Sequence, residues 1–178
     1  PRVEFIVGEL QKVSLPRRRF DAAVGNVPFS GARVSDSASG FYGPLHEYFV
    51  QRAIAAVRPG GYVVLVTSRH TMDAVRGLSA GIRRDADLMA AVRLPSGYFK
   101  AAGTDVVADV LILRVRDGEP LGWDPGAEPH TVDLSAMVGG RYSRAKVSAL
   151  WEERPQLVAG KINLTGFDRE PISVDTDD

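Results

Sequence analysis

The chain has 178 residues, of which 44% are hydrophobic and 25% are charged, as is typical of a globular protein. Its 22 basic residues balance 22 acidic ones, so no overall positive charge attracts it to nucleic acid. The absence of cysteine excludes disulfides and thiolate metal sites, and the three histidines are too scattered to suggest a zinc cluster. Neither an apolar run of about 18 residues nor a signal peptide is present, which predicts a cytoplasmic location without a membrane partner.

The first part of the chain contains two predicted strands and a long connection. Val3–Val7 is apolar, β-branched and bounded by a glycine, which predicts a strand. Phe20–Gly25 predicts a second, buried strand that ends in a turn at Asn26. Ser30–Gly43 is rich in serine and glycine and has little periodicity, so we expect a mobile loop there.

A helix and a central strand follow. Apolar residues at helical spacing predict a helix over Leu45–Val57, which the breaker cluster Arg58–Gly61 ends. Tyr62–Thr67 is apolar at every position except the last. Such a run is typical of a strand covered on both faces, as in a parallel sheet.

The next stretch predicts a helix and two strands without a helix between them. The helix is expected over Met72–Arg84, and the strands over Leu88–Leu94 and Val106–Val115. The strands are joined by Pro95–Thr104, a loop long enough to suggest a function. This order predicts an α/β sheet with an antiparallel edge.

Beyond Asp117 the pattern weakens into short segments. We therefore expect two regions: residues 1–117 as the C-terminal part of a catalytic domain, and residues 118–178 as an appendage or the start of a following region.

The segment Asn26-Val27-Pro28-Phe29 carries the clearest chemistry. An amide oxygen and a neighbouring backbone carbonyl can accept both hydrogens of an exocyclic amine, while an aromatic ring offers a stacking face. These parts suit a flat heterocycle that bears an amine, so they favour methyl transfer to the amino group of adenine. For an isolated motif of this kind, the competing interpretation is a strand-end turn with Phe29 buried in the core.

Several stretches in order resemble the catalytic domain of adenine-specific amino-DNA methyltransferases. The resemblance is greatest to the type found in large phage- or plasmid-borne methyltransferase–helicase fusions. The stretches are Phe20–Phe29, Leu45–Val50, Arg58–Arg69, Arg93–Leu113 and Trp151–Thr165. The resemblance implies a Rossmann-like class I fold, S-adenosylmethionine as cofactor and DNA as substrate, with the target base flipped out of the helix.

The chain departs from that family in two places. Val27 stands where the family usually has a first proline, which is acceptable because only a backbone carbonyl is needed there. The Gly-rich cofactor turn of the family is absent, and Val3–Leu10 resembles its third strand. We therefore expect a truncated fold without the first two strands. Another polypeptide region would complete the sheet, or the chain would rearrange or oligomerise.

The resemblance also implies roles for further residues. Glu9 and Leu10 would contact the cofactor, although a solvated Glu at a strand end is an equal alternative. Phe99 and Lys100 would lie beside the flipped base, against the alternative of a core aromatic and a surface lysine. Gly103 and Thr104 would shape the same loop.

Two basic features are better explained without a site. Arg17–Arg19 could bind phosphates, but a charge run is usually a solvated surface. His46 matches the family pattern, yet a single histidine near a helix start is more often a structural hydrogen-bonding group.

Three functions remain open at this point. The favoured one is adenine methylation of DNA, with target recognition supplied by further domains or chains, a helicase being one candidate. The second is an inactive DNA-binding or scaffolding module that has lost cofactor binding. The third is a methyltransferase acting on a protein amide. We expect these 178 residues alone to bind S-adenosylmethionine weakly or not at all.

Overall fold

A computed structural model describes residues 3–74, 77–100, 106–118, 131–138, 145–165 and 171–176. Its strands are β1 (Phe20–Asn26), β2 (Arg33–Asp36), β3 (Phe41–Pro44), β4 (Val57–Ser68), β5 (Ala86–Arg93), β6 (Ala108–Val115), β7 (Thr131–Asp133), β8 (Lys146–Ser148), β9 (Lys161–Leu164) and β10 (Ile172–Asp175). Its helices are α1 (Leu45–Ala56), α2 (Ala80–Asp85), α3 (Leu134–Val138) and α4 (Leu150–Glu153), with short 3₁₀ turns η1 (Arg69–Thr71) and η3 (Pro155–Leu157).

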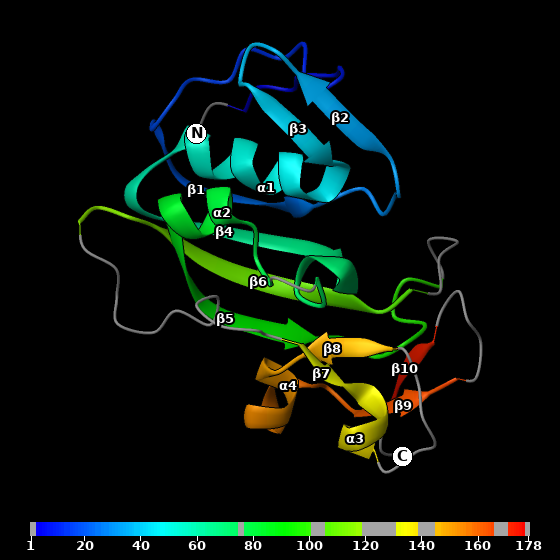
Figure 1. Cartoon of the computed structure of the whole chain (residues 1–178). Coiled ribbons are helices and arrows are strands. Elements are labelled where there is room, and N and C mark those ends of the chain that lie inside the picture. Colours follow the sequence, from blue (N-terminus) through cyan, green and yellow to red (C-terminus); the bar gives the residue numbers. More distant parts are fainter. Residues whose placement is uncertain are drawn as a thin grey trace.

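The central element is a four-stranded sheet in the order β1-β4-β6-β5 (Figure 1). β1 pairs with β4 in parallel, whereas β6 runs antiparallel to both of its neighbours. The predicted α/β fold, a truncated Rossmann-like sheet, is confirmed. The predicted antiparallel strand also exists, but it lies inside the sheet between β4 and β5 rather than at the edge.

One face of this sheet carries the core. The helices α1 and α2 lie over it in Figure 1. Val63 and Leu65 of β4 belong to the same buried cluster as Val50 and Ile54 of α1 and Ile82 of α2. Apolar residues at the spacing of one helix face therefore do place α1 on the sheet, as its sequence predicted.

The opposite face of the sheet is only half-buried, so the prediction of a strand covered on both faces was wrong. Along β4, buried residues alternate with partly exposed ones from Gly61 to Ser68. Val64 lies beside Ile112, and Val66 beside Val110, on this second face. A continuous apolar run indicates two apolar faces, but it does not ensure that the described residues cover both.

β1 is an exposed edge strand, not the buried strand that was predicted. It pairs only with β4, and six of its seven residues are exposed. Val24 is 78% exposed and Phe20 is 44% exposed. Its apolar sequence thus lies at an open sheet edge, where backbone groups on the outer side have no ladder partner in the described part of the chain.

The segment Val3–Val7 is irregular and exposed, so the strand predicted there was wrong. Phe5 is 89% exposed and Val7 is fully exposed. A strand needs a neighbour for its backbone hydrogen bonds, and none of the described strands pairs with this segment.

Two other predictions, a mobile loop over Ser30–Gly43 and a helix over Met72–Arg84, were wrong. Ser30–Gly43 is not a loop throughout, since β2 and β3 form a hairpin in it. The Asp36 carboxylate shapes its turn by accepting hydrogen bonds from the Ala38 N–H (3.0 Å) and the Ser39 hydroxyl (2.7 Å). The helix predicted over Met72–Arg84 is reduced to η1 just before it and the six-residue α2.

The C-terminal segments pack beyond β5 (Figure 1). Val147, Leu150 and Trp151 belong to the same buried cluster as the sheet residues. The Ala159 N–H donates to the Arg93 carbonyl at 2.9 Å, which attaches the segment to the end of β5. The division near Asp117 into a catalytic part and an appendage stays a prediction.

Candidate functional site

The segment Asn26–Phe29 continues directly from the carboxyl end of β1. The Val27 N–H donates to the Val66 carbonyl at 2.8 Å, and the Val27 side chain is 1% exposed. Val27 therefore anchors the turn to β4, although its sequence position was expected to matter only for a carbonyl. Burial of this side chain holds the residues on either side of it at the surface.

Asn26 itself is exposed, and its side-chain amide makes no hydrogen bond to the described part of the chain. Pro28 is exposed as well. The Asn26 amide is therefore not turned inward toward the core. An amide oxygen with open lone pairs at the end of a strand is available to an incoming donor.

Phe29 is half-buried and contacts a second aromatic ring. Its ring centroid lies 5.8 Å from that of Phe99 in an edge-to-face arrangement, and Tyr98 packs on Phe99 at 5.2 Å. The structure thus brings Phe99 to Asn26–Phe29 across 70 residues of sequence, while its role beside a flipped base stays a prediction. Lys100 is exposed next to Phe99, while Gly103 and Thr104 lie outside the described residues.

A cavity of about 410 Å³ borders Phe29. Its walls come from the segment after β1, from the β2–β3 hairpin, from the start of α1 and from the end of β4. The lining residues are Phe29, Ser30, Gly31, Arg33, Pro44, His46, Ser68, His70 and Val106. Sequence reasoning named His46 as a structural residue and did not foresee that His70 and Arg33 would meet it in one cavity.

The two residues assigned to the cofactor lie elsewhere. Glu9 is at the surface in an ion pair with Lys12 at 3.0 Å, with both side chains mostly exposed. Leu10 is half-buried in the same turn. Neither residue lines the cavity that borders Phe29.

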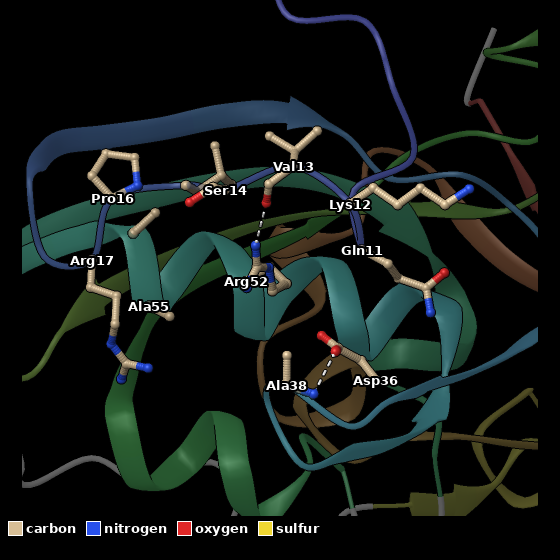
Figure 2. A pocket seen from close by; sticks show the side chains of 12 residues that line it. Gln11, Lys12, Val13, Ser14, Pro16, Arg17, Asp36, Ala38, Arg52 and Ala55 are labelled. Carbon is tan, nitrogen blue, oxygen red and sulfur yellow. Dashed lines mark hydrogen bonds between the residues drawn. The ribbon is translucent and has the colours of Figure 1, made fainter.

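A separate cavity of about 320 Å³ lies between residues 11–17 and α1 (Figure 2). The Arg52 side chain closes part of it by donating to the Val13 carbonyl at 3.0 Å. Arg17 lines this cavity, but none of the residues predicted to act on a substrate does. It therefore adds nothing to the site around Asn26.

Sequence reasoning also missed a buried ionic cluster centred on Arg93. Arg93, which is fully buried, donates to both oxygens of Asp109 (2.9 and 3.0 Å) and to Asp73 (2.9 Å). The same Asp73 oxygen accepts from the Ser148 N–H at 2.9 Å and from the Trp151 indole N–H at 3.3 Å.

The Arg93 guanidinium also lies over the Trp151 ring, 4.5 Å from its centroid. This cluster joins β5, β6 and the segment that follows η1 to the C-terminal segment. No motif in the sequence marks it, because its members are separated by up to 78 residues.

Comparison with known proteins gives one relative by sequence. The chain is 33% identical over 140 residues to the defense against restriction protein B of Escherichia phage P1. The match covers 73% of this chain but only 6% of that protein. No family model matches the chain.

Solved structures show weaker likenesses. A chain described as the modification subunit of a type I restriction enzyme from Vibrio vulnificus has 21% identity and a TM-score of 0.47, with 90% of this chain and 38% of that chain covered. A protein described as a class I S-adenosylmethionine-dependent methyltransferase from Listeria monocytogenes has 19% identity and a TM-score of 0.46, with 62% and 37% covered. Because both TM-scores lie below 0.5, the fold assignment depends on the sheet order described above.

Proposed function

We propose that this chain is the target-base part of a DNA methyltransferase that modifies the exocyclic amine of adenine. The observation that carries this proposal is the exposed Asn26 amide at the end of β1, without a hydrogen bond in the described chain, beside the Phe29 ring and its cavity. A strand-end turn with only a structural role would not need an open amide next to a half-buried aromatic ring that borders a cavity.

The proposed chemistry is one of alignment. The adenine amine is a poor nucleophile because its lone pair is delocalised into the ring. Hydrogen bonds from that amine to the Asn26 side-chain oxygen and the Val27 carbonyl favour a pyramidal nitrogen. Its lone pair then becomes available, and no strong general base is required. Phe29 stacks on the extruded base, which contributes about 1–3 kcal/mol against the cost of unstacking it. Phe99 packs edge-to-face against Phe29 and so supports this stacking surface.

The methyl donor in this proposal is S-adenosylmethionine, yet the described residues do not by themselves fit it. Glu9 is engaged with Lys12 at the surface, and no described cavity joins Glu9 or Leu10 to the Asn26 segment. The open edge of β1 suggests where the missing groups belong, because a further strand can add there. We infer that other domains or chains complete the sheet at this edge, hold the cofactor and supply target recognition, with a helicase as one candidate.

The test uses the complete protein that contains this chain. Asn26→Ala should lower methyl transfer from labelled S-adenosylmethionine to DNA by about 10²- to 10³-fold, as expected when a preorganised polar group is removed. Cofactor affinity should change less than about twofold, since the cofactor does not contact Asn26 in this proposal. The matched control is Asn163→Ala, because Asn163 is half-buried and its amide already bonds to Asp175 at 2.7 Å in the β9–β10 hairpin.

The outcome separates the rival functions. Unchanged DNA methylation in Asn26→Ala would remove this residue from the mechanism. Labelling of protein but not DNA by the unmodified enzyme would favour a protein amide as substrate. DNA binding without any labelling would favour the inactive DNA-binding module, for which the surface ion pair of Glu9 is the supporting observation.

A further inference from the structure

The cavity beside Phe29 has a lining that a base pocket alone does not require. Its polar side chains are those of Arg33, His46, His70 and two serines, Ser30 and Ser68. Every one of these can donate a hydrogen bond, and no carboxylate lines the cavity. The whole chain is neutral, with 22 basic and 22 acidic residues, so this is a local excess of donors.

Two further features keep this wall positive. The Arg33 guanidinium lies over the Tyr42 ring, 4.8 Å from its centroid, which holds it at the cavity rim. The helix α1 starts beside it at Leu45 with no side-chain cap, so the partial positive charge of the helix start adds to the same wall. Both features favour an anion in the cavity.

The two histidines lie close enough to influence each other. Burial lowers the pKa of His46, and the charge of His70 lowers it further. The charged or titratable groups around His46 are His70 from η1, Arg33 from β2 and Glu47 on α1. Glu47 is half-buried in the first turn of α1; burial raises its pKa, while the Ser79 hydroxyl and the Arg33 charge lower it, so its carboxylate offsets part of the Arg33 charge. An anion placed between the two imidazoles would stabilise their protonated forms.

We propose that this cavity is a phosphate subsite, which binds a phosphodiester of the DNA strand next to the adenine held at Asn26. The inference rests on the proposed function for its choice of DNA as the source of the phosphate. Phe29 links the two sites, because it lines the cavity and also provides the ring on which the adenine is proposed to stack. In a nucleotide the phosphate is attached to the base through one sugar, so a phosphate site must lie next to the ring that stacks on the base.

The first experiment measures binding of a fluorescein-labelled single-stranded oligonucleotide with one adenine to the 178-residue chain by fluorescence anisotropy. Arg33→Gln should weaken binding roughly tenfold and reduce the slope of log K against log salt by about 0.7, the value for one phosphate contact. The matched control is Arg84→Gln, which removes the same charge from an exposed residue paired with Asp85. Equal losses in both variants, or no binding by the unmodified chain at millimolar concentration, would overturn the proposal.

The second experiment follows the histidine Cε1–H resonances by NMR, which is simple because the chain has three histidines. Saturation with the oligonucleotide should raise the pKa of His46 and of His70, and His70→Gln should remove one of these signals. A His46 titration that is the same with and without bound DNA contradicts a phosphate at this site. His70→Gln also serves as the second binding variant if Arg33→Gln lowers the melting temperature.

The third experiment separates this inference from the proposed function. Replacing the adenine by a purine without the amine should weaken binding through Asn26 but leave the Arg33→Gln effect intact. Replacing the neighbouring phosphate by a neutral methylphosphonate should weaken oligonucleotide binding by the unmodified chain. It should leave binding by the Arg33→Gln variant unchanged. If inorganic phosphate shifts the histidine signals while DNA does not, the site takes free phosphate and the DNA assignment is wrong.

Discussion

At the scale of single residues, the protein places charged groups in two contrasting environments. Exposed pairs such as Arg84–Asp85 lie in water, which screens their interaction. The cluster of Arg93, Asp109 and Asp73 is buried, with Arg93 and Asp109 both 0% exposed. In such a site each charge depends on its partners, because removal from water is costly unless hydrogen bonds and opposite charges compensate.

Asp109→Ala should therefore destabilise the chain by about 3–5 kcal/mol, since it leaves the buried Arg93 guanidinium without its bidentate partner. The control, Asp85→Ala, removes an exposed carboxylate and should cost no more than about 1 kcal/mol. Urea unfolding followed by Trp fluorescence measures both. A loss below about 1 kcal/mol in Asp109→Ala would show that the buried Arg93 does not depend on Asp109 for charge compensation.

A second single residue, His46, should make the folding stability depend on pH. Burial and then the His70 charge lower its pKa below the ordinary value of 6.5, so the folded chain binds this proton less readily than the unfolded chain. The contribution of His46 to stability is therefore complete above that ordinary value and is lost as the pH falls below it. In melting curves between about pH 7.5 and pH 5.5, His46→Gln should lose less stability on acidification than the unmodified chain. The stability that His70→Gln loses on acidification should lie between those two. If the melting temperatures of all three proteins depend on pH in the same way, the predicted contribution of His46 is wrong.

At the scale of elements, neighbouring strands decide what an apolar segment becomes. Val57–Ser68 forms the long strand β4, which pairs with a strand on each side. This strand includes the cluster Arg58–Gly61, which was expected only to end the helix. The ladder between β1 and β4 shifts register between Phe20 and Ala22 to admit this cluster. Gly60, with φ of 75°, adopts a left-handed backbone conformation at the shift.

Gly61 is needed at this shift for a different reason. A Cβ there would lie 2.5 Å from the Asp21 carbonyl oxygen on β1 and 2.6 Å from the Val57 side chain. Gly61→Ala should destabilise the chain by about 1–3 kcal/mol, because the backbone of β1 must move away. Gly118→Ala is the control, since a Cβ at Gly118 meets nothing within 4 Å. Equal melting temperatures for the two variants would show that the β1–β4 pairing is not as close as described.

At the scale of the whole molecule, the sheet is closed on one side and open on the other. The C-terminal segments pack on the β5 side, through Trp151 and the Arg93 cluster, whereas β1 leaves its outer edge unpaired. The apolar residues Val3, Phe5, Ile6 and Val7 lie exposed as well. No helix among the described residues is long and apolar enough to cross a membrane. An open apolar edge of this kind suits strand addition from another region.

The 178 residues alone should therefore bind S-adenosylmethionine with a Kd weaker than about 1 mM, equivalent to roughly 4 kcal/mol of binding free energy. Isothermal titration calorimetry measures this, with a cooperative melting curve of the same sample as proof of folding. Tight binding at one cofactor per chain would contradict the proposal that the cofactor groups come from beyond the β1 edge.

The sequence by itself was enough to identify α1, the strands β4, β5 and β6, and the motif Asn26–Phe29, because each depends on a local pattern of apolar residues or turn formers. Only the tertiary structure decided which faces are covered, that Phe99 meets Phe29, and that His46, His70 and Arg33 line one cavity. It also decided that Val3–Val7 is not a strand and that Arg93 is buried among carboxylates. The physical reason is that burial, strand pairing and charge compensation are made between segments far apart in the chain, so no local pattern contains them.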